Sequence, residues 1–237
     1  VLGCIFNKVN APLDEEGRAR ADLVDAYKPE ELENELNRLA SLPIFKKNPF
    51  MLLGAIPWDF DLVAPRAKDL SAYLKATIIN EGVMLHRRLR RSTFCARTVS
   101  NILNYFTPGA LLVTPGDRSD ILVAACLSAM NGTKLGAILL TGGFEPEPRI
   151  MALCEQAMQT GLPILATDAD TWRTSLLLHN FNMEVPNDDD QRIEKVKDHN
   201  AEYIDSSWLD TLAQSVGKTR KLSPPAFRYL LTDKARK

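Results

Sequence analysis

Apolar and polar positions form two distinct patterns along residues 110–143, and the rest of the chain is organised around this stretch. The runs Ala110–Val113 and Ala137–Leu140 are apolar, and each stops at a short turn containing glycine. Between them, Ser119–Met130 carries apolar residues at helical spacing and ends before an Asn-Gly pair. Short apolar runs bounded by turns predict buried strands, and the periodic segment predicts a helix. The stretch therefore predicts a strand-helix-strand unit with parallel strands.

The alternation of short strands and amphipathic helices continues on both sides of this unit. Before it we expect a strand and a helix, and after it a helix, a strand and a helix, at Arg91–Ala96, Thr98–Phe106, Pro148–Thr160, Pro163–Thr167 and Asp170–Phe181. Two more helices are expected at Arg192–Ile204 and Ser207–Gln214. Alternating strands and helices are typical of α/β folds. We predict a compact α/β sandwich with a mainly parallel sheet.

A smaller α/β piece precedes this sandwich. Its expected strands are Val1–Phe6 and Phe50–Ile56, and its expected helices are Pro29–Ala40 and part of Asp61–Leu74. Two strands are too few for a self-sufficient doubly wound domain. We predict domains at 1–75 and 91–215, a linker at 76–90 whose first residues could instead form a short edge strand, and a connector at 216–237. Because the first residues already form a strand pattern without an initiator Met, we expect both ends to continue in a longer protein.

Charge and composition exclude several classes of function. The chain has 29 basic and 30 acidic residues and a net charge of -1, so it has no overall field that attracts nucleic acid or anionic membrane. No apolar run approaches the roughly 20 residues that span a bilayer. The four cysteines and three histidines show no metal-ligand spacing, and we expect reduced, buried cysteines in a cytoplasmic protein. We predict no metal and no cofactor.

Candidate chemistry lies in the two loops that follow the central strands. Asp117, Arg118 and Ser119 stand where the helix begins, and Thr141, Gly142 and Gly143 follow the next strand. If the strands are neighbours, both loops lie at one edge of the sheet, where open α/β sheets bind ligands. Arg118 and the helix N-terminus could hold a phosphate or carboxylate. The alternative is structural: Asp117 caps the helix, Arg118 is a surface residue, and the glycines form a turn.

Other polar clusters give weaker signals. Asn7, Lys8 and Asn10 follow the first predicted strand and could contact a nucleotide, or could simply form a turn. The run Asp188–Asp190 fits the start of a helix, where negative charge is favourable. No Walker-type phosphate loop, GxGxxG fingerprint or GxSxG elbow occurs in the sequence. Nothing assembles a nucleophile, a base and an oxyanion hole.

Three stretches together resemble the long form of bacterial phosphate acetyltransferase. They are residues 93–97 (TFCAR), residues 110–143, and residues 222–229 (LSPPAFRY). The middle domain of that family is named the DRTGG domain after recurrent residues that correspond here to Asp117, Arg118, Thr141, Gly142 and Gly143. Residues 3–12 (GCIFNKVNAP) and 54–62 (GAIPWDFDL) resemble the end of the family's N-terminal domain, which is similar to dethiobiotin synthetase and other P-loop proteins.

The resemblance implies a regulatory and oligomerisation region. The family enzyme interconverts acetyl-CoA plus phosphate with acetyl phosphate plus CoA, and its catalytic domain follows the DRTGG domain. The resemblance therefore implies that this chain carries no catalytic residues and ends about where that domain begins. It also implies self-association, as a dimer of the DRTGG domain and a hexamer in the parent enzyme, and effectors such as NADH, ATP or pyruvate.

Two alternatives remain open on the sequence. One is an ATP-dependent ligase of the dethiobiotin-synthetase type, favoured by the strand before Asn7 and opposed by the missing phosphate loop. The other is a dimerisation module that binds no small ligand.

Overall fold

The structure is a computed structural model that describes residues 3–13, 29–46, 50–181 and 184–219. The chain divides into two compact units, described separately below. Unit 1 comprises residues 1–10, 28–58 and 196–237, and unit 2 comprises residues 11–27 and 59–195. Most of the predicted connector, from residue 220 to residue 237, lies outside the described residues.

Unit 2 is built on a five-stranded sheet. In spatial order its strands are β3 (Thr77–Asn80), β7 (Ile164–Ala166), β6 (Ala137–Thr141), β5 (Ala110–Pro115) and β4 (Arg91–Phe94). Strands β4 to β7 are parallel, and β3 pairs antiparallel with β7 at one edge. The fold class is therefore α/β with a mainly parallel sheet, as predicted.

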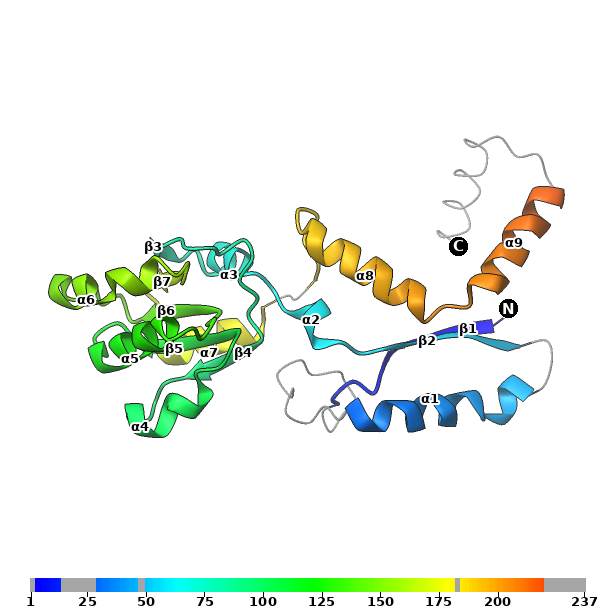
Figure 1. Cartoon of the computed structure of the whole chain (residues 1–237), viewed down its shortest axis with the longest axis horizontal. Coiled ribbons are helices and arrows are strands. Elements are labelled where there is room, and N and C mark those ends of the chain that lie inside the picture. Colours follow the sequence, from blue (N-terminus) through cyan, green and yellow to red (C-terminus); the bar gives the residue numbers. More distant parts are fainter. Residues whose placement is uncertain (1–2, 14–28, 47–49, 182–183, 220–237) are drawn as a thin grey trace. The chain divides into compact units, whose positions relative to one another are not determined.

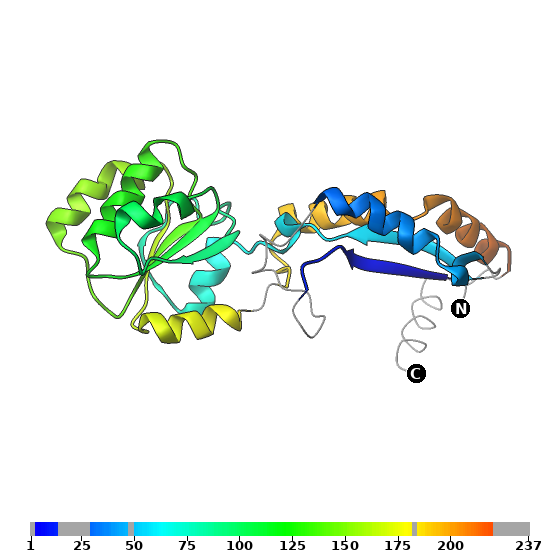
Figure 2. The same cartoon turned by 90° about the horizontal axis from the view of Figure 1, so that it is seen from below.

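Helices cover both faces of this sheet. One face carries α4 (Val99–Ile102) with its extension η4 (Leu103–Tyr105), α5 (Ser119–Met130) and α6 (Pro148–Met158). The other face carries α3 (Ala67–Leu74) and α7 (Thr171–His179) (Figures 1 and 2). Strands β4 to β7 follow one another across the sheet without reversal. Right-handed crossovers therefore place the three connecting helices on the same face.

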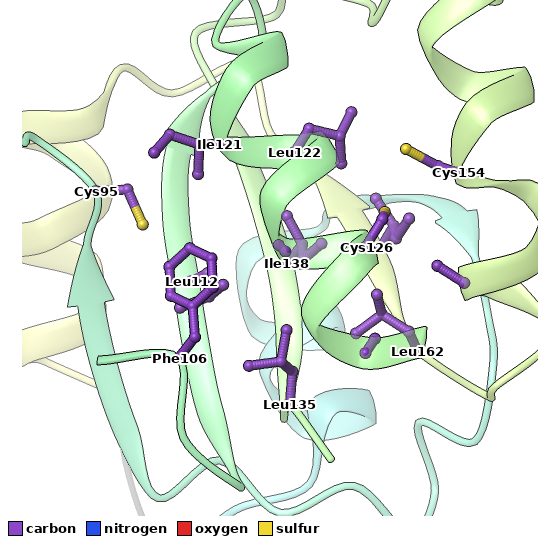
Figure 3. Close-up of a cluster of buried hydrophobic side chains, with 14 of the residues drawn as sticks. Cys95, Phe106, Leu112, Ile121, Leu122, Cys126, Leu135, Ile138, Cys154 and Leu162 are labelled. Carbon is purple, nitrogen blue, oxygen red and sulfur yellow. The ribbon is translucent and has the colours of Figure 1, made fainter. Parts of the chain in front are cut away.

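The central strands are buried on both faces, which explains their unbroken apolar sequence. In β5, Ala110 and Leu112 point into the core under α4, α5 and α6 (Figure 3), whereas Leu111 and Val113 point into the core under α3 and α7. All four side chains are at most 1% exposed. Burying a leucine of this kind contributes roughly 2 kcal/mol. Strands covered on both sides lose the apolar-polar alternation of half-exposed strands.

Unit 1 contains a small parallel sheet of β1 (Gly3–Val9) and β2 (Met51–Pro57). Its helices are η2 (Pro29–Glu31), α1 (Leu32–Ala40), η3 (Pro43–Lys46), α9 (Ser206–Thr219) and the second half of α8 (Asp190–Glu202). Residues 203–205 run close to β2, because a Cβ on Gly54 would lie 2.6 Å from the Tyr203 carbonyl oxygen. The Asp205 N–H donates to the Leu53 carbonyl oxygen at 2.8 Å.

Several predicted elements differ from the observed ones. Strand β1 extends to Val9 instead of stopping at Phe6, so the polar residues after Phe6 are part of the strand. The expected helix Thr98–Phe106 is a four-residue α-helix followed by a 3-10 turn. Residues 77–80 form the edge strand β3, which is the alternative that the sequence left open beside a linker. Helix α9 extends to Thr219, so residues 216–219 are helical and not part of a connector.

The units also divide the chain at other positions than the predicted domains. The longer segment of unit 2 runs from Asp59 to Lys195, whereas the sequence suggested 91 and 215. Helix α2 (Phe60–Val63) and α3 belong to unit 2, because α3 supplies Ala67 and Leu70 to the core under the sheet. Among the described residues, no helix is both long and apolar enough to cross a membrane.

Candidate functional site

The carboxyl ends of four parallel strands share one edge of the sheet in unit 2. Pro115 of β5 is in register with Thr141 of β6, and the Gly116 N–H donates to the Thr141 carbonyl oxygen at 3.0 Å. The loop that carries Asp117 and Arg118 is therefore adjacent to the loop that carries Gly142 and Gly143. We call these loops, with the ends of β4 and β7, the rim.

The rim is a row of loops and not a crevice between oppositely running crossovers. Ligands of doubly wound sheets bind where the strand order reverses. Strands β4 to β7 succeed one another in a single direction, so their order has no reversal. The two loops are adjacent, as the sequence predicted. The four parallel strands, however, have no reversal of order that would open a ligand-binding cleft between them.

Arg118 is committed to a neighbouring carboxylate. Its Nε and Nη2 donate to Oδ1 and Oδ2 of Asp120, both at 2.8 Å, and Nη2 also donates to the Arg97 carbonyl oxygen at 3.3 Å. The hydrogen bonds from Arg118 lower the pKa of Asp120, and those to Asp120 raise the pKa of Arg118. An anion at this position would have to compete with Asp120 for the guanidinium.

The start of α5 differs from the predicted cap. Arg118, not Asp117, is the N-cap residue of α5. Its side chain accepts no hydrogen bond from the backbone N–H groups of the first helical turn. Asp117 is exposed, and its backbone carbonyl accepts from the Ser119 N–H at 3.0 Å. Asp120 takes over the electrostatic role, because a carboxylate in the first turn favours the positive end of the helix dipole.

The second loop is held by α7. Thr141 is 1% exposed, and its hydroxyl lies 2.7 Å from the hydroxyl of Thr171, the first residue of α7. The Gly142 N–H donates to the Ala169 carbonyl oxygen at 2.8 Å. Gly142 has φ of 87°, a left-handed conformation that glycine adopts without strain. Gly143 shares this conformation, with φ of 69°.

Phe144 occupies the space between the two loops. A Cβ on Gly142 would lie 2.9 Å from Cε2 of the Phe144 ring, and a Cβ on Gly116 would overlap the Phe144 carbonyl oxygen. Glycine is needed at both positions so that residue 144 can lie this close. The Phe144 side chain is still 52% exposed, so it forms part of the rim surface.

Polar atoms beneath the rim are buried without a visible partner. Neither the Thr93 nor the Thr114 hydroxyl oxygen has a hydrogen-bond partner, although these residues are 7% and 0% exposed. Cys95 lies in the same core and is 2% exposed (Figure 3). Burial raises the pKa of the Cys95 thiol to about 11, against the opposing charge of Arg118. Cys95 is therefore protonated at neutral pH and inert as a nucleophile.

The three predicted nucleotide contacts lie in unit 1. Asn7 and Lys8 are exposed residues of β1, and Asn10 follows the strand. The Asn7 side chain accepts from the Lys8 N–H at 2.8 Å, and both Lys8 and Asn10 have positive φ. These residues and the rim belong to different compact units.

The aspartates before α8 do more than favour a helix start. The Asp188 carboxylate accepts from Arg66 and Lys68, both at 2.7 Å. Asp189 is 2% exposed and accepts two hydrogen bonds from Arg88, at 2.5 and 2.6 Å. These residues tie the start of α8 to residues 66–88 within unit 2. Sequence reasoning missed this cluster because its partners are about 100 residues apart.

In the described residues, no three His, Cys, Asp or Glu side chains group closely enough to hold a metal ion. Three of the four cysteines are buried and all four are free.

A family model matches residues 69–181 of unit 2, and its description is the DRTGG domain. The chain contains a DRTGG domain. Asp117, Arg118, Thr141, Gly142 and Gly143 all lie within the matched residues of this domain. The resemblance found in the sequence is thereby confirmed.

Full-length similarity places the DRTGG domain within a larger protein. Over all of its residues the chain is 50% identical to the phosphate acetyltransferase of Escherichia coli and 43% identical to that of Haemophilus influenzae. The match to the Pseudomonas aeruginosa phosphate acetyltransferase is 41% identical. The chain covers 32–33% of these relatives, about a third of their length. It corresponds to a region of phosphate acetyltransferase that contains a DRTGG domain.

The chain is also similar to a solved structure. It holds the CBS and DRTGG domains of the regulatory region of Clostridium perfringens pyrophosphatase with its activator, diadenosine tetraphosphate. The match is 19% identical, covers 51% of this chain and 50% of that chain, and has a TM-score of 0.41. At this TM-score the similarity is too low to infer a shared ligand.

Sequence reasoning missed three residues of the rim. Asp120 was detectable, because an acidic residue two positions after an arginine at a helix start can pair with it. Phe144 and Thr171 were not, because their positions depend on how the loop after β6 and the start of α7 pack against the sheet.

Proposed function

We propose that this chain is a regulatory and oligomerisation region of phosphate acetyltransferase, whose parent reaction converts acetyl-CoA and phosphate into acetyl phosphate and CoA. The observation that carries the proposal is the full-length match to one third of that enzyme. The bonds are made and broken elsewhere in the parent protein. In support, the rim offers paired charges and a buried protonated thiol, but no activated nucleophile in the described residues.

The proposed ligand site is the rim, formed by Asp117, Arg118 and Ser119 on one loop and by Thr141, Gly142 and Gly143 on the other. The support is their adjacency, set by the Pro115–Thr141 register. An anionic effector such as NADH, ATP or pyruvate would take over the Arg118 guanidinium from Asp120. Its binding would therefore be coupled to the first turn of α5.

This exchange gives a sharp test. We expect at least one of NADH, ATP and pyruvate to raise the melting temperature of the chain, since a ligand that binds only the folded state stabilises it. Arg118→Ala should abolish that increase. Asp120→Asn should enlarge it, because the guanidinium loses its internal competitor. The matched control is Arg38→Ala, which breaks the similar Arg38–Glu35 pair on α1.

Three outcomes contradict the site. They are a screen with no shift at saturating effector, a shift that survives Arg118→Ala, and a shift that Arg38→Ala abolishes equally. The proposed lack of catalysis is tested separately, by assaying acetyl phosphate formation from acetyl-CoA and phosphate with this chain alone. Measurable turnover would refute it.

We also propose that unit 1 is part of a larger P-loop-like α/β domain. Among the described residues, β1 pairs only with β2, and Ile5 and Met51 of this small sheet are 45% and 39% exposed. Parallel sheets are normally covered on both faces, so further chain must be expected around it. Self-association and a cytoplasmic location complete the proposal, with neither nucleic acid nor membrane as partners.

A further inference from the structure

Two threonine hydroxyls on the α5 side of the sheet are buried without a hydrogen-bond partner in the described part of the chain. Thr93 lies on β4 and is 7% exposed, and Thr114 lies on β5 and is 0% exposed. A buried hydroxyl without a partner is unfavourable, because it loses its hydrogen bonds to water and gains none in return. Folded proteins contain few such groups. We therefore expect a partner from outside the chain for at least one of the two.

Thr114 lies at the end of the core that is nearest to the rim. It follows Leu112 by two positions in β5, so both side chains point to the side of the sheet that carries α5. Leu112 packs in the same core as Ile121, which belongs to the first turn of α5 (Figure 3). Thr114 is one step closer to the rim than Leu112. Its hydroxyl therefore lies beneath the first turn of α5.

A neighbouring thiol indicates that the Arg118–Asp120 pair lies over the same end of the core. The Cys95 N–H donates to the Val113 carbonyl oxygen at 2.8 Å, which continues the register of β4 and β5 and places Cys95 beside Thr114. Burial raises the pKa of the Cys95 thiol, the charge of Arg118 opposes this effect, and the charge of Asp120 adds to it. Both charges are therefore close to Cys95, and so to its neighbour Thr114.

The present partner of Arg118 is a carboxylate, which has only two oxygens. Both oxygens of Asp120 accept from the guanidinium at 2.8 Å, and neither serves the Thr114 hydroxyl. The Arg118 and Asp120 side chains are 32% and 50% exposed, and a pair this open to water is displaced at little cost. A phosphoryl group has three acceptor oxygens. Two of them fit the guanidinium as a carboxylate does, and the tetrahedral geometry directs the third out of the guanidinium plane.

We propose that the rim binds a phosphoryl group in place of the Asp120 carboxylate, with two oxygens on the Arg118 guanidinium and a third accepting from the Thr114 hydroxyl. The inference rests on the proposed ligand site and names the chemical class of its ligand. The N-terminus of α5 favours the negative charge. Thr114 then determines specificity, because the carboxylate of pyruvate has no third oxygen for it. Inorganic phosphate and the phosphates of a nucleotide share this chemistry.

A hydroxyl-to-methyl substitution tests the assignment. Isothermal titration calorimetry of the full chain at constant ionic strength would measure binding of inorganic phosphate, ATP, NADH and pyruvate. We expect at least one phosphorylated ligand to bind about 10-fold tighter than pyruvate or more. Thr114→Val should weaken phosphoryl binding about 10-fold and leave pyruvate binding unchanged, because it removes one hydrogen bond to a charged group. Thr114→Ser keeps a hydroxyl and should keep the affinity.

The matched control is Thr93→Val. Thr93 points to the same side of the sheet as Cys95, and it is in register with Leu112, one step farther from the rim than Thr114. Its hydroxyl is also buried without a partner in the described residues, so Thr93→Val makes the same chemical change away from the site. We expect unchanged binding of all four ligands. Both valine variants should keep at least the wild-type urea midpoint, because neither hydroxyl has a partner to lose.

The outcomes separate this inference from the proposed function. Phosphoryl binding that Thr114→Val leaves unchanged, or that Thr93→Val weakens equally, would overturn the phosphoryl assignment and leave the Arg118 site standing. Pyruvate binding tighter than all phosphorylated ligands, or a lower urea midpoint for Thr114→Val, would do the same. No binding of any of the four ligands would overturn the site itself. If the assignment holds, tighter binding of ATP or NADH than of phosphate identifies an esterified phosphoryl group, and the reverse identifies the free ion.

Discussion

At the scale of single residues, the rim is shaped by what glycine allows. Gly116 has ordinary backbone angles, so its role is not conformational. It is required because the Phe144 backbone lies where a Cβ would be. The space beside Gly142 is likewise filled by the chain's own Phe144 ring, whose Cε2 would lie 2.9 Å from a Cβ at residue 142.

We predict that Gly116→Ala destabilises unit 2 by about 2 kcal/mol, because overpacking against a backbone carbonyl cannot be relieved by a side-chain rotation. Urea denaturation followed by circular dichroism measures the change. Phe144→Ala in the same background should not rescue it, since the overlap is with the carbonyl oxygen. A loss below about 0.5 kcal/mol in Gly116→Ala would show that the loop can move aside.

The loss of folding stability at acidic pH should depend in part on Asp188. Hydrogen bonds from Lys68 and then Arg66 lower the pKa of Asp188 to about 2, from 3.8. A carboxyl whose folded-state pKa is lowered stabilises the fold fully above its unfolded pKa, and this contribution is lost as the pH falls towards the folded value. We expect Asp188→Asn to lower the urea midpoint at pH 6, with the difference from the wild type shrinking between about pH 4 and pH 2. A difference that is independent of pH would contradict this pairing.

At the scale of elements, a buried charge cluster joins the beginning and the end of unit 2. Arg66 is 4% exposed and bonds to Asp69 within its own helix start, and also to Asp188 before α8. Burial acts to raise the pKa of Asp189, but the hydrogen bond and charge of Arg88, with the charge of Arg66, outweigh it and lower that pKa. The start of α8 is therefore attached to unit 2 by ion pairs, and no residue of α8 belongs to the hydrophobic core clusters.

Asp189→Ala should cost about 3 kcal/mol, because it leaves the Arg88 guanidinium without its buried counter-charge, whereas Arg66 keeps Asp69 and Asp188. Asp189→Ala combined with Arg88→Met should recover part of the loss, since replacing both partners by apolar groups removes the uncompensated charge. Thermal and urea unfolding of the two variants would measure both effects. Equal losses in the single and double variants would contradict the pairing.

At the scale of the whole molecule, the cluster also indicates where the folded unit ends. The matched DRTGG residues, 69–181, leave out Arg66, Asp188 and Asp189. Unit 2 includes all three. The segment that matches the DRTGG family model is therefore shorter than the segment of unit 2 that packs together.

We predict that a fragment of residues 59–195 unfolds cooperatively and is more stable than a fragment of residues 69–181 by at least about 3 kcal/mol, because only the longer one keeps the charge cluster. Denaturant unfolding of both fragments is the measurement. If the shorter fragment is equally stable, the flanking segments contribute no net stability.

The sequence by itself determined the local elements and the family. The apolar runs at Ala110–Val113 and Ala137–Leu140 are long enough, and bounded sharply enough by turns, to specify buried parallel strands, and α5 was predicted with its observed ends. These features depend on neighbouring residues alone. The adjacency of the two rim loops also followed, because consecutive parallel strands usually pair.

Only the tertiary structure decided what those residues contact. Trp172, a large aromatic residue in the first turn of α7, is 74% exposed. Arg118 was expected to be free for an anion and is paired with Asp120, and the aspartates before α8 are paired with arginines about 100 residues away. Hydrophobic periodicity encodes which side of an element is buried, but the partner of a polar group depends on long-range packing, which a local pattern does not contain.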